Sequence, residues 1–417
     1  MTGDSGPGER LRLTVGAVAH GGHCVARHDG RVIFVRHTLP GEVVTAEVTE
    51  GGADARFWRA DAVEIHEASP DRVPSAWPEA GPGGVGGGEL AHVALPAQLA
   101  WKLAVLREAF QRFAGPTHGV GLFPSDEVRS AVGATGPGDD EAGGLGYRTR
   151  VGAVAGPDGR ASMRAFRSHA VRRLERMPLA TPAAEEALLA GRWTEGATIE
   201  VVDASGEDKV RVLVDGRPWT ARGVDRRPNA PSHVREVVTL GGEEHSYRVA
   251  AGGFWQVHRA APEILAREVV ERIGDAGAVL DLYAGSGLFT LPLAATGREV
   301  SSVESDAQAA KDARRNLHAH PAARVIEGDV REMLRAGLGR YEAVVMDPPR
   351  SGAGRATLEA LHTTGASALV YVACDPVALA RDVAILRELG YGLESATAWD
   401  LYPMTHHVET VATFRRG

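Results

Sequence analysis

Cysteine is scarce in this sequence, which has only Cys24 and Cys374 among its 417 residues. Two thiols are too few for a disulfide framework or for a zinc site made of four thiolates. The two also fall in segments with different patterns of apolar residues. This scarcity is typical of a protein that stays in a reducing compartment.

Long apolar runs are absent as well. No uninterrupted apolar stretch approaches the length that spans a membrane, although 44% of the residues are hydrophobic. The start of the chain, MTGDSGPGE, lacks the basic residues and apolar core of a secretory signal. We therefore expect a cytosolic monomer with no membrane partner, and its length suits about two to four domains.

Lysine is the third scarcity, because every basic residue except Lys102, Lys209 and Lys311 is arginine. The net charge of −8 argues against a globally basic nucleic-acid binder, but not against a local basic footprint. Two basic stretches contain few acids, and we expect them to contact phosphate or another anion rather than form only a solvated face. They comprise Arg148, Arg150, Arg160, Arg164, Arg167, Arg172, Arg173 and Arg176, and then Lys209, Arg211, Arg217, Arg222, Arg226, Arg227 and Arg235.

The N-terminal sequence alternates short apolar runs with glycine-containing turns, a pattern typical of a small β-barrel. A segment rich in proline and glycine follows, and then the spacing of apolar residues predicts a helix from Pro96 to Phe113. A mixed segment that holds both basic stretches is interpreted as a small α/β domain. The expected divisions are an OB-like barrel at 1–67, a linker and helix at 68–115, the middle domain at 116–250 and a final domain at 251–417.

The C-terminal part alternates buried strands with helices, which predicts an α/β fold with a doubly wound, mostly parallel sheet. Two further runs, Leu393–Trp399 and Glu409–Phe414, are suited to close one edge of this sheet. The expected parallel strands are Ala278–Leu282, Glu299–Val303, Arg324–Ile326, Ala343–Asp347 and Ala368–Ala373.

A glycine-rich turn follows the first of these strands. Gly285 and Gly287 allow the backbone to turn tightly beneath a ligand, and Thr290 stands where a dinucleotide fingerprint has its third glycine. A nucleoside without a pyrophosphate is therefore favoured. Acids end three successive strands, namely Glu304, Asp329 and Asp347. Together these features indicate an adenosine-type ligand such as S-adenosylmethionine.

Cys374 ends the last parallel strand, and a helix-start signal follows it at once. With Asp375 as N-cap and Pro376 in the first turn, the thiol lies beside the positive end of a helix, which favours the thiolate. A free cysteine is also often a small buried hydrophobe, so both interpretations stay open. Glu409 begins a terminal strand, where a glutamate is more often solvated than catalytic.

The N-terminal segment contains Gly21-Gly22, Ala26–Arg31, Phe34-Val35 and Leu39–Glu42. With these residues it resembles a TRAM domain, which implies RNA binding. The C-terminal half resembles the RNA uracil-5 methyltransferases, which act on uridines of tRNA and 23S rRNA, and this implies a Rossmann-like class I methyltransferase domain. The residues that carry this second resemblance are Phe254-Trp-Gln256, Asp281–Gly287, Val303-Glu304, Asp347–Arg350, Cys374–Pro376, Ala380–Asp382 and Pro403–Glu409, and Gly146–Arg150 and Phe166–His169 extend it into the middle domain.

The resemblance implies that Cys374 is a nucleophile toward uracil C6 and Glu409 a base, with S-adenosylmethionine as methyl donor and RNA as partner. It also implies that Gln256, Tyr283, Glu304, Asp329 and Asp347 line the donor site, beside Gly285 and Gly287. One rival hypothesis is a methyltransferase for another acceptor, in which Cys374 is only structural. Another is an RNA-binding or chaperone protein that has lost activity.

The sequence departs from this family at two places. Asp375 follows the cysteine where asparagine is common. Some relatives with a TRAM domain carry four cysteines for an iron–sulfur cluster, three near 77–88 and one near 177, whereas this chain has none there and has Met177 near the fourth position. We therefore expect neither an iron–sulfur cluster nor another metal.

Overall fold

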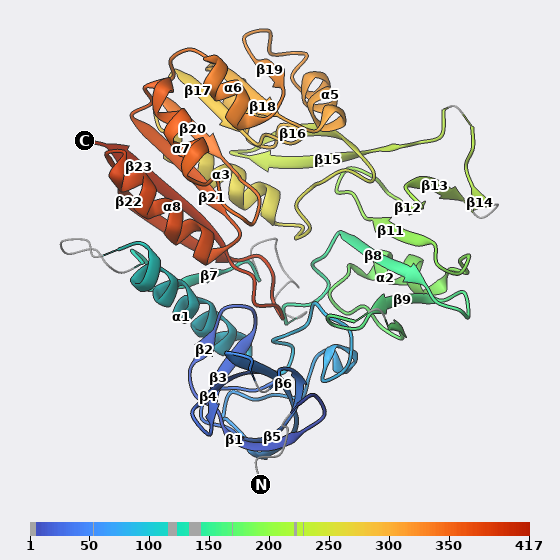
Figure 1. The fold of residues 1–417 in the computed structure, drawn as a ribbon. Coiled ribbons are helices and arrows are strands. Elements are labelled where there is room, and N and C mark those ends of the chain that lie inside the picture. The colour runs from blue at the N-terminus through green and yellow to red at the C-terminus, as the bar shows by residue number, and fades with distance from the viewer. Residues whose placement is uncertain are drawn as a thin grey trace.

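The computed structural model describes residues 6–52, 54–115, 123–132, 143–168, 170–220, 223–227 and 229–417. Figure 1 shows a rounded N-terminal barrel below a larger C-terminal sheet, with an antiparallel middle sheet to one side. None of the helices in these ranges is long and apolar enough to cross a membrane.

The N-terminal barrel is a six-stranded sheet in the order β1-β5-β6-β4-β3-β2. Backbone bonds from Gly16 N to Val25 O and from Val25 N to Ala17 O link the chain after β1 to β3, so the sheet curls onto itself. Inward residues such as Ile33 and Val35 alternate with outward ones along β4. The predicted barrel is confirmed. Its strands are β1 (Arg10–Thr14), β2 (Val18–Ala19), β3 (His23–His28), β4 (Arg31–Arg36), β5 (Val43–Glu50) and β6 (Phe57–Glu67).

Helix α1 (Leu95–Phe113), which follows a short 3-10 turn at Pro78–Ala80, lies between the barrel and the C-terminal sheet (Figure 1). Trp101 and Val105 pack into the core of the barrel, whereas Leu106 and Phe110 pack into the core beneath the C-terminal sheet. The helix therefore buries two faces, and it joins the two domains rather than merely separating them.

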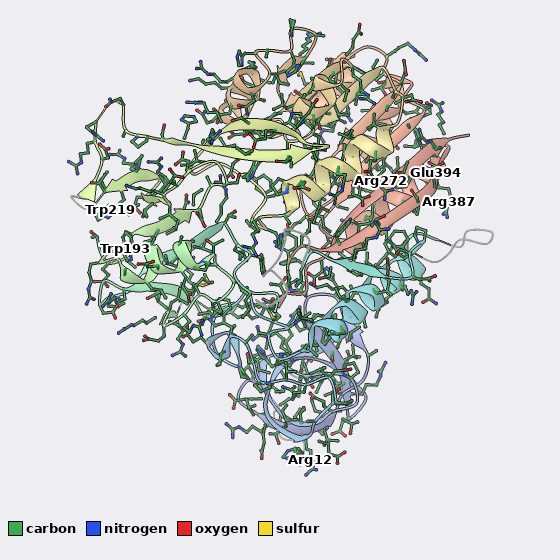
Figure 2. All side chains as sticks on the ribbon, turned by 180° about the vertical axis from the view of Figure 1, so that it is seen from behind. Arg12, Trp193, Trp219, Arg272, Arg387 and Glu394 are labelled. Atoms are coloured by element: carbon green, nitrogen blue, oxygen red, sulfur yellow. The ribbon has the colours of Figure 1, made fainter. Side chains whose placement is uncertain are left out.

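The middle sheet is antiparallel, in the order β10-β9-β8-β11-β12-β13-β14. Trp219 on β13 packs near Trp193, which lies between α2 and β11; both are labelled in Figure 2, and their ring centroids are 5.8 Å apart. Its elements are β8 (Arg150–Ala155), β9 (Ala161–Arg164), β10 (Val171–Arg173), α2 (Pro182–Ala190), β11 (Thr198–Val202), β12 (Arg211–Val214), β13 (Arg217–Thr220) and β14 (Gly223–Val224).

Two parts of the range 116–250 belong to the C-terminal unit. Strand β7 (Val128–Ser130) pairs with β22 at the edge of the C-terminal sheet. The hairpin of β15 (His233–Leu240) and β16 (Glu243–Ala250) packs on the same unit, where Tyr247 donates to the backbone oxygen of Leu288 at 3.0 Å. The middle segment thus supports the C-terminal sheet as well as forming its own.

The C-terminal sheet has the order β19-β18-β17-β20-β21-β23-β22-β7, with the first five strands parallel and β23 antiparallel between β21 and β22. The predicted doubly wound sheet and its two closing strands are confirmed. The strands are β17 (Ala278–Leu282), β18 (Glu299–Glu304), β19 (Arg324–Glu327), β20 (Ala343–Met346), β21 (Ala368–Ala373), β22 (Tyr391–Asp400) and β23 (Glu409–Arg416).

Helices cover both faces because successive side chains of each strand point to opposite sides. Val279 and Val345 face the core under α3 and α4, while Leu280 and Val344 face the core under α6, α7 and α8. Arg272 of α3, labelled in Figure 2, donates to Ser395 at 2.9 Å. The helices are α3 (Ala261–Ile273), α4 (Thr290–Ala295), α5 (Ala307–Asn316), α6 (Val330–Ala336), α7 (Arg355–Leu361) with a 3-10 turn at His362–Thr364, and α8 (Pro376–Glu388).

Candidate active site at the carboxyl edge of the sheet

The turn after β17 forms a cradle at the carboxyl edge of the sheet. Tyr283, Gly285 and Gly287 all have positive φ, at 62°, 56° and 93°. A Cβ atom placed on Gly285 would meet no atom within 4 Å, so this glycine borders open space. Its amide donates to Glu304 Oε2 at 2.8 Å, which fixes the carboxylate of the next strand against the turn.

The acids predicted to bind the ligand lie at neighbouring strand ends. Glu304 ends β18, and its second carboxylate oxygen accepts from Asp306 N at 2.6 Å. Asp329 caps α6 by accepting from Glu332 N at 3.0 Å. The pKa of Tyr283 is raised by burial and further by Asp329, so the charge of Asp329 acts on the Tyr283 hydroxyl. The parallel register explains this arrangement, because equivalent strand ends meet at one edge.

Sequence reasoning missed Asp281, which is fully buried on β17. Thr290 donates to its Oδ2 at 2.5 Å, while Oδ1 has no hydrogen-bond partner among the described residues. Burial raises the pKa of Asp281 to about 7, and burial together with Asp281 raises the pKa of Asp347 to about 7. An acid inside an otherwise apolar strand was the signal in the sequence.

Cys374 and Glu409 lie opposite each other on neighbouring strands. The antiparallel register pairs Ala373 of β21 with Thr410 of β23. Cys374, which follows Ala373, therefore lies beside Glu409, which precedes Thr410. Glu409 is only 3% exposed, and its Oε2 accepts from the Tyr402 hydroxyl at 3.4 Å. Burial and Asp347 hold the pKa of Glu409 well above its usual range, against the opposing effects of Tyr402 and Arg350.

The thiol is not in the environment that the sequence predicts. Asp375 does cap α8, but its carboxylate accepts from Val377 N at 3.0 Å and Ala378 N at 2.8 Å. The positive end of the helix is therefore occupied by its own cap. Burial, Glu409 and Asp347 together raise the pKa of Cys374 to about 12. The expectation that this position favours the thiolate is wrong for the protein without ligands, because burial and the neighbouring carboxyl groups raise the pKa of Cys374 more than Arg350 lowers it.

The basic stretches are partly engaged within the protein. Arg150 is partly buried and pairs with Glu236 at 3.0 Å, and Arg167 pairs with Glu50 of the barrel at 2.9 Å. Arg172 is exposed on β10. His169 and Arg222 lie outside the described residues. Arg164, Arg172, Arg217, Arg226 and Arg235 are exposed and form no ion pair with an acid among the described residues, so they remain available to contact an anion.

Two other predicted positions lie near the start of α3. Gln256 is buried in the turn between β16 and α3, whereas its neighbour Phe254 is 74% exposed.

No group of three or more His, Cys, Asp or Glu side chains within the described ranges is arranged to hold a metal ion.

Comparison with known proteins decides the family. Residues 5–63 match the TRAM domain, residues 257–371 the methyltransferase small domain and residues 330–416 the tRNA (uracil-5-)-methyltransferase family. The chain is 32% identical to the 23S rRNA (uracil(1939)-C(5))-methyltransferase RlmD of Methylococcus capsulatus, over 98% of each protein. The chain belongs to the S-adenosylmethionine-dependent RNA uracil-5 methyltransferases.

Another relative and a solved structure match this chain over nearly its whole length. An RNA methyltransferase of Streptomyces avermitilis is 40% identical over 97% of this chain and 98% of its own length. The crystal structure of the Pyrococcus abyssi tRNA (uracil-54, C5)-methyltransferase with S-adenosyl-L-homocysteine superposes with a TM-score of 0.70 at 21% identity. That superposition covers 97% of this chain and 100% of the other, so all three parts of the fold are shared.

The residues at this edge suit the methyl donor of the family. S-Adenosylmethionine carries a positive sulfonium and a positive ammonium group. A cation that binds beside buried carboxyl groups lowers their raised pKa values, because it favours their charged forms. The charged carboxylates in turn stabilise the bound cation. Asp281 and Asp347 provide this environment beside the open cradle at Gly285, and the unpartnered Asp281 Oδ1 is available to accept a hydrogen bond.

Proposed function

We propose that this methyltransferase transfers a methyl group from S-adenosylmethionine to C5 of a specific uridine in tRNA or 23S rRNA, through a covalent adduct between Cys374 and uracil C6. The observation that carries the proposal is the pairing of Cys374 with Glu409 across β21 and β23, beside Asp347 at the end of β20. A nucleophile and a base are thereby set next to an edge suited to a positively charged methyl donor.

The first step requires the thiol. Uracil C5 is a poor nucleophile until a group adds at C6, and the Cys374 thiolate forms a bond to C6 that leaves an enolate. Carbon C5 of the enolate then takes the methyl group that S-adenosylmethionine supplies. Since the pKa of Cys374 is raised to about 12 in the free protein, substrate binding must favour ionisation, and Arg350 is the nearby cation that lowers this pKa.

The second step requires a base. Glu409 takes the proton from C5, the bond between Cys374 and C6 breaks, and the thiolate is regenerated. Glu409 would lose its own proton more readily while a cationic methyl donor lies near Asp347, and its proton affinity would rise once methyl transfer to the enolate has turned the sulfonium into a neutral thioether. The carboxyl group is thus a stronger base after methyl transfer than before it.

Access to both faces of the uracil ring requires that the target uridine leaves its stack, because the thiol and the methyl donor act from opposite sides. The barrel and the exposed residues of β10 are proposed to hold the surrounding RNA. The Methylococcus relative acts on 23S rRNA and the Pyrococcus protein on tRNA. Both RNAs are therefore proposed as candidate substrates of this chain.

We further propose that this member works without an iron–sulfur cluster. A four-cysteine cluster needs ligands that this sequence does not contain, since Cys24 is buried in the core of the barrel. The segment around residue 80 instead contributes to an apolar cluster in which Trp77 and Ala80 pack with Met177.

The decisive experiment uses RNA that contains 5-fluorouridine. Fluorine at C5 cannot leave as a proton does, so the adduct of Cys374 should persist as a slow band on a denaturing gel that requires S-adenosylmethionine. Cys374→Ala should give no band. Methylation of ordinary RNA by this variant would show instead that the acceptor is chemically different and the thiol only structural. Absence of S-adenosylmethionine binding would point to a protein that only binds RNA.

The target nucleotide requires a second measurement. Nucleosides of tRNA and rRNA from cells with and without the gene should differ in 5-methyluridine at one mapped position by mass spectrometry. An unchanged 5-methyluridine content in both RNA pools would contradict the proposed substrate.

A further inference from the structure

The catalytic loop, residues 401–408, joins β22 to Glu409 at the start of β23, and segments outside its sheet hold it in place. Leu90 N donates to Met404 O at 2.9 Å, and the Tyr147 hydroxyl donates to Pro403 O at 3.0 Å. Met404 has a φ of 66°, a conformation that a residue with a Cβ adopts only when its surroundings impose it. The conformation of the loop therefore depends on these external contacts.

Gln98 on α1 supplies one such contact. Its side chain is completely buried, and its Oε1 accepts from Met404 N at 2.8 Å. Its amide nitrogen donates to Val93 O at 2.8 Å and to Leu90 O at 3.3 Å. A single amide thus ties the loop to both the helix and the segment before it.

Lys102 lies one helical turn further along the same face of α1. Its Nζ is 2.5 Å from Asp400 Oδ1 and 3.0 Å from Tyr402 O, and Asp400 Oδ1 also accepts from Tyr402 N at 3.1 Å. The two charged side chains are 0% and 2% exposed. Both backbone hydrogen-bonding groups of Tyr402 are therefore held by one buried ion pair.

Tyr402 connects this pair to the chemistry, because its hydroxyl donates to Glu409 Oε2. We propose that Gln98 and Lys102 are positioning residues for the catalytic base: through Met404, Tyr402 and Asp400 they set the orientation of Glu409 toward the C5 proton. This inference rests on the proposed role of Glu409 in the second step.

A role in stability alone makes a different prediction. Buried ion pairs are costly to desolvate, and neutral side chains of similar volume often replace them with little loss of stability. The variant Lys102→Met/Asp400→Asn removes both charges together and keeps an oxygen that can accept from Tyr402 N. It loses the bond from Lys102 to Tyr402 O, so it should fold while leaving the loop less firmly held.

The test is a single-turnover reaction of the full chain with RNA and S-adenosylmethionine. In Lys102→Met/Asp400→Asn we expect formation of S-adenosylhomocysteine to stay within about threefold of wild type, while release of methylated RNA from Cys374 slows by about tenfold or more. The covalent complex should therefore accumulate. A proportional fall in both rates, or normal release, would overturn the inference.

The matched control is Arg272→Met/Glu268→Gln. This partly buried pair on α3 also holds the closing strands, since Arg272 donates to Ser395 on β22 and to Thr413 on β23, but it contacts no residue of the catalytic loop in the described structure. We expect thermal stability to fall while the ratio of the release rate to the transfer rate stays at the wild-type value. A slowed release in this control too would show that general loosening of the sheet explains the effect.

Gln98 gives a second test that involves no buried charge pair. Gln98→Leu should slow release selectively, whereas Gln98→Glu, protonated in this buried position and able to accept from Met404 N, should restore it substantially. Equal release by both variants would overturn the role of Gln98. If the wild-type protein forms no adduct with Cys374, the proposed function itself fails; if it forms and resolves the adduct and these variants do so equally fast, only the positioning inference fails.

Discussion

The proposed active site combines two regions that are built in different ways. The cofactor edge, formed by the carboxyl ends of β17, β18, β19 and β20, is held by local contacts such as the bond from Gly285 N to Glu304. The catalytic loop has local turns, such as the bond from Thr405 Oγ1 to Tyr402 O, but it also depends on distant segments. Its backbone is bound by Leu90, Gln98 and Lys102, about three hundred residues away in sequence, and by Tyr147 of the middle segment.

Because the two regions are held by different contacts, we expect the cofactor edge to control binding of S-adenosylmethionine and the catalytic loop to control proton transfer. Changes at the cofactor edge should alter the affinity for S-adenosylmethionine and leave the loop in place, because contacts within this edge, such as the bond from Gly285 N to Glu304, hold its acids. Changes in the loop or its supports should alter the fate of the covalent adduct. Cys374 lies where the two regions meet, beside both Asp347 and Glu409.

Loss of the thiol should have the largest effect, since it stops the reaction shared by both regions. Cys374→Ala should lower methyl transfer by about 10⁴-fold or more, because no other group can add at C6. Isothermal titration should give unchanged S-adenosylmethionine binding. Cys24→Ser is the control and should be nearly silent, since a hydroxyl can replace the buried thiol that donates to Thr38 O at 3.6 Å. Residual turnover within tenfold of wild type would remove Cys374 from the mechanism.

Glu409→Gln tests the loop side alone. Cys374 should still add and the methyl group should still transfer, but release should slow by about 10² to 10⁴ because an amide is a very poor proton acceptor. A methylated adduct that needs both S-adenosylmethionine and Cys374 should accumulate on a denaturing gel. Slow turnover with no trapped adduct would instead direct attention to His406 or His407 as the base.

Glu304→Ala tests the cofactor edge alone. Its carboxylate accepts from Gly285 N and Asp306 N, so its removal should loosen the cradle and weaken S-adenosylmethionine binding by about tenfold to a hundredfold. RNA affinity and the rate of adduct release should not change. An effect on release as large as that on binding would show that the two regions are not independent.

The pH dependence of donor binding should reflect the acids at the cofactor edge. Burial raises the pKa values of Asp281 and Asp347 to about 7, so these groups are mostly neutral below that pH and mostly charged above it. Affinity for cationic S-adenosylmethionine should therefore rise between pH 6 and 8, by less than about tenfold per unit for each acid. S-Adenosylhomocysteine, which lacks the sulfonium, should respond less. Equal pH profiles for the two ligands would contradict this electrostatic account.

The smallest effect is expected outside both regions. Replacing Arg172 and Arg173 with alanine should weaken RNA binding modestly and reduce its salt slope by about one or two, according to the number of phosphates contacted. Arg173 already pairs with Glu175 at 3.1 Å and Asp158 at 3.5 Å, so Arg172 should account for most of the change. An unchanged slope would place the RNA elsewhere, without affecting either region of the active site.

The sequence by itself determined the features that depend on neighbours along the chain. Alternating buried strands and helices specify the doubly wound sheet, and Gly285, Glu304 and Asp347 follow directly from where strands end, because parallel strands bring those ends to one edge. The barrel follows in the same way from short strands and glycine turns. Cys374 and its helix cap were also predictable, since both belong to one strand–helix junction.

Tertiary structure decided what depends on segments distant in sequence. The pKa of Cys374 is raised because folding buries the thiol and places Glu409 and Asp347 beside it, which outweighs the local helix start. The chain also gave no sign that α1, between two loop-like segments, carries Lys102 to Asp400. Burial of the Lys102 charge requires a partner of opposite charge, because an unpaired charge is costly to remove from water. That partner, Asp400, lies on a strand about three hundred residues away in sequence.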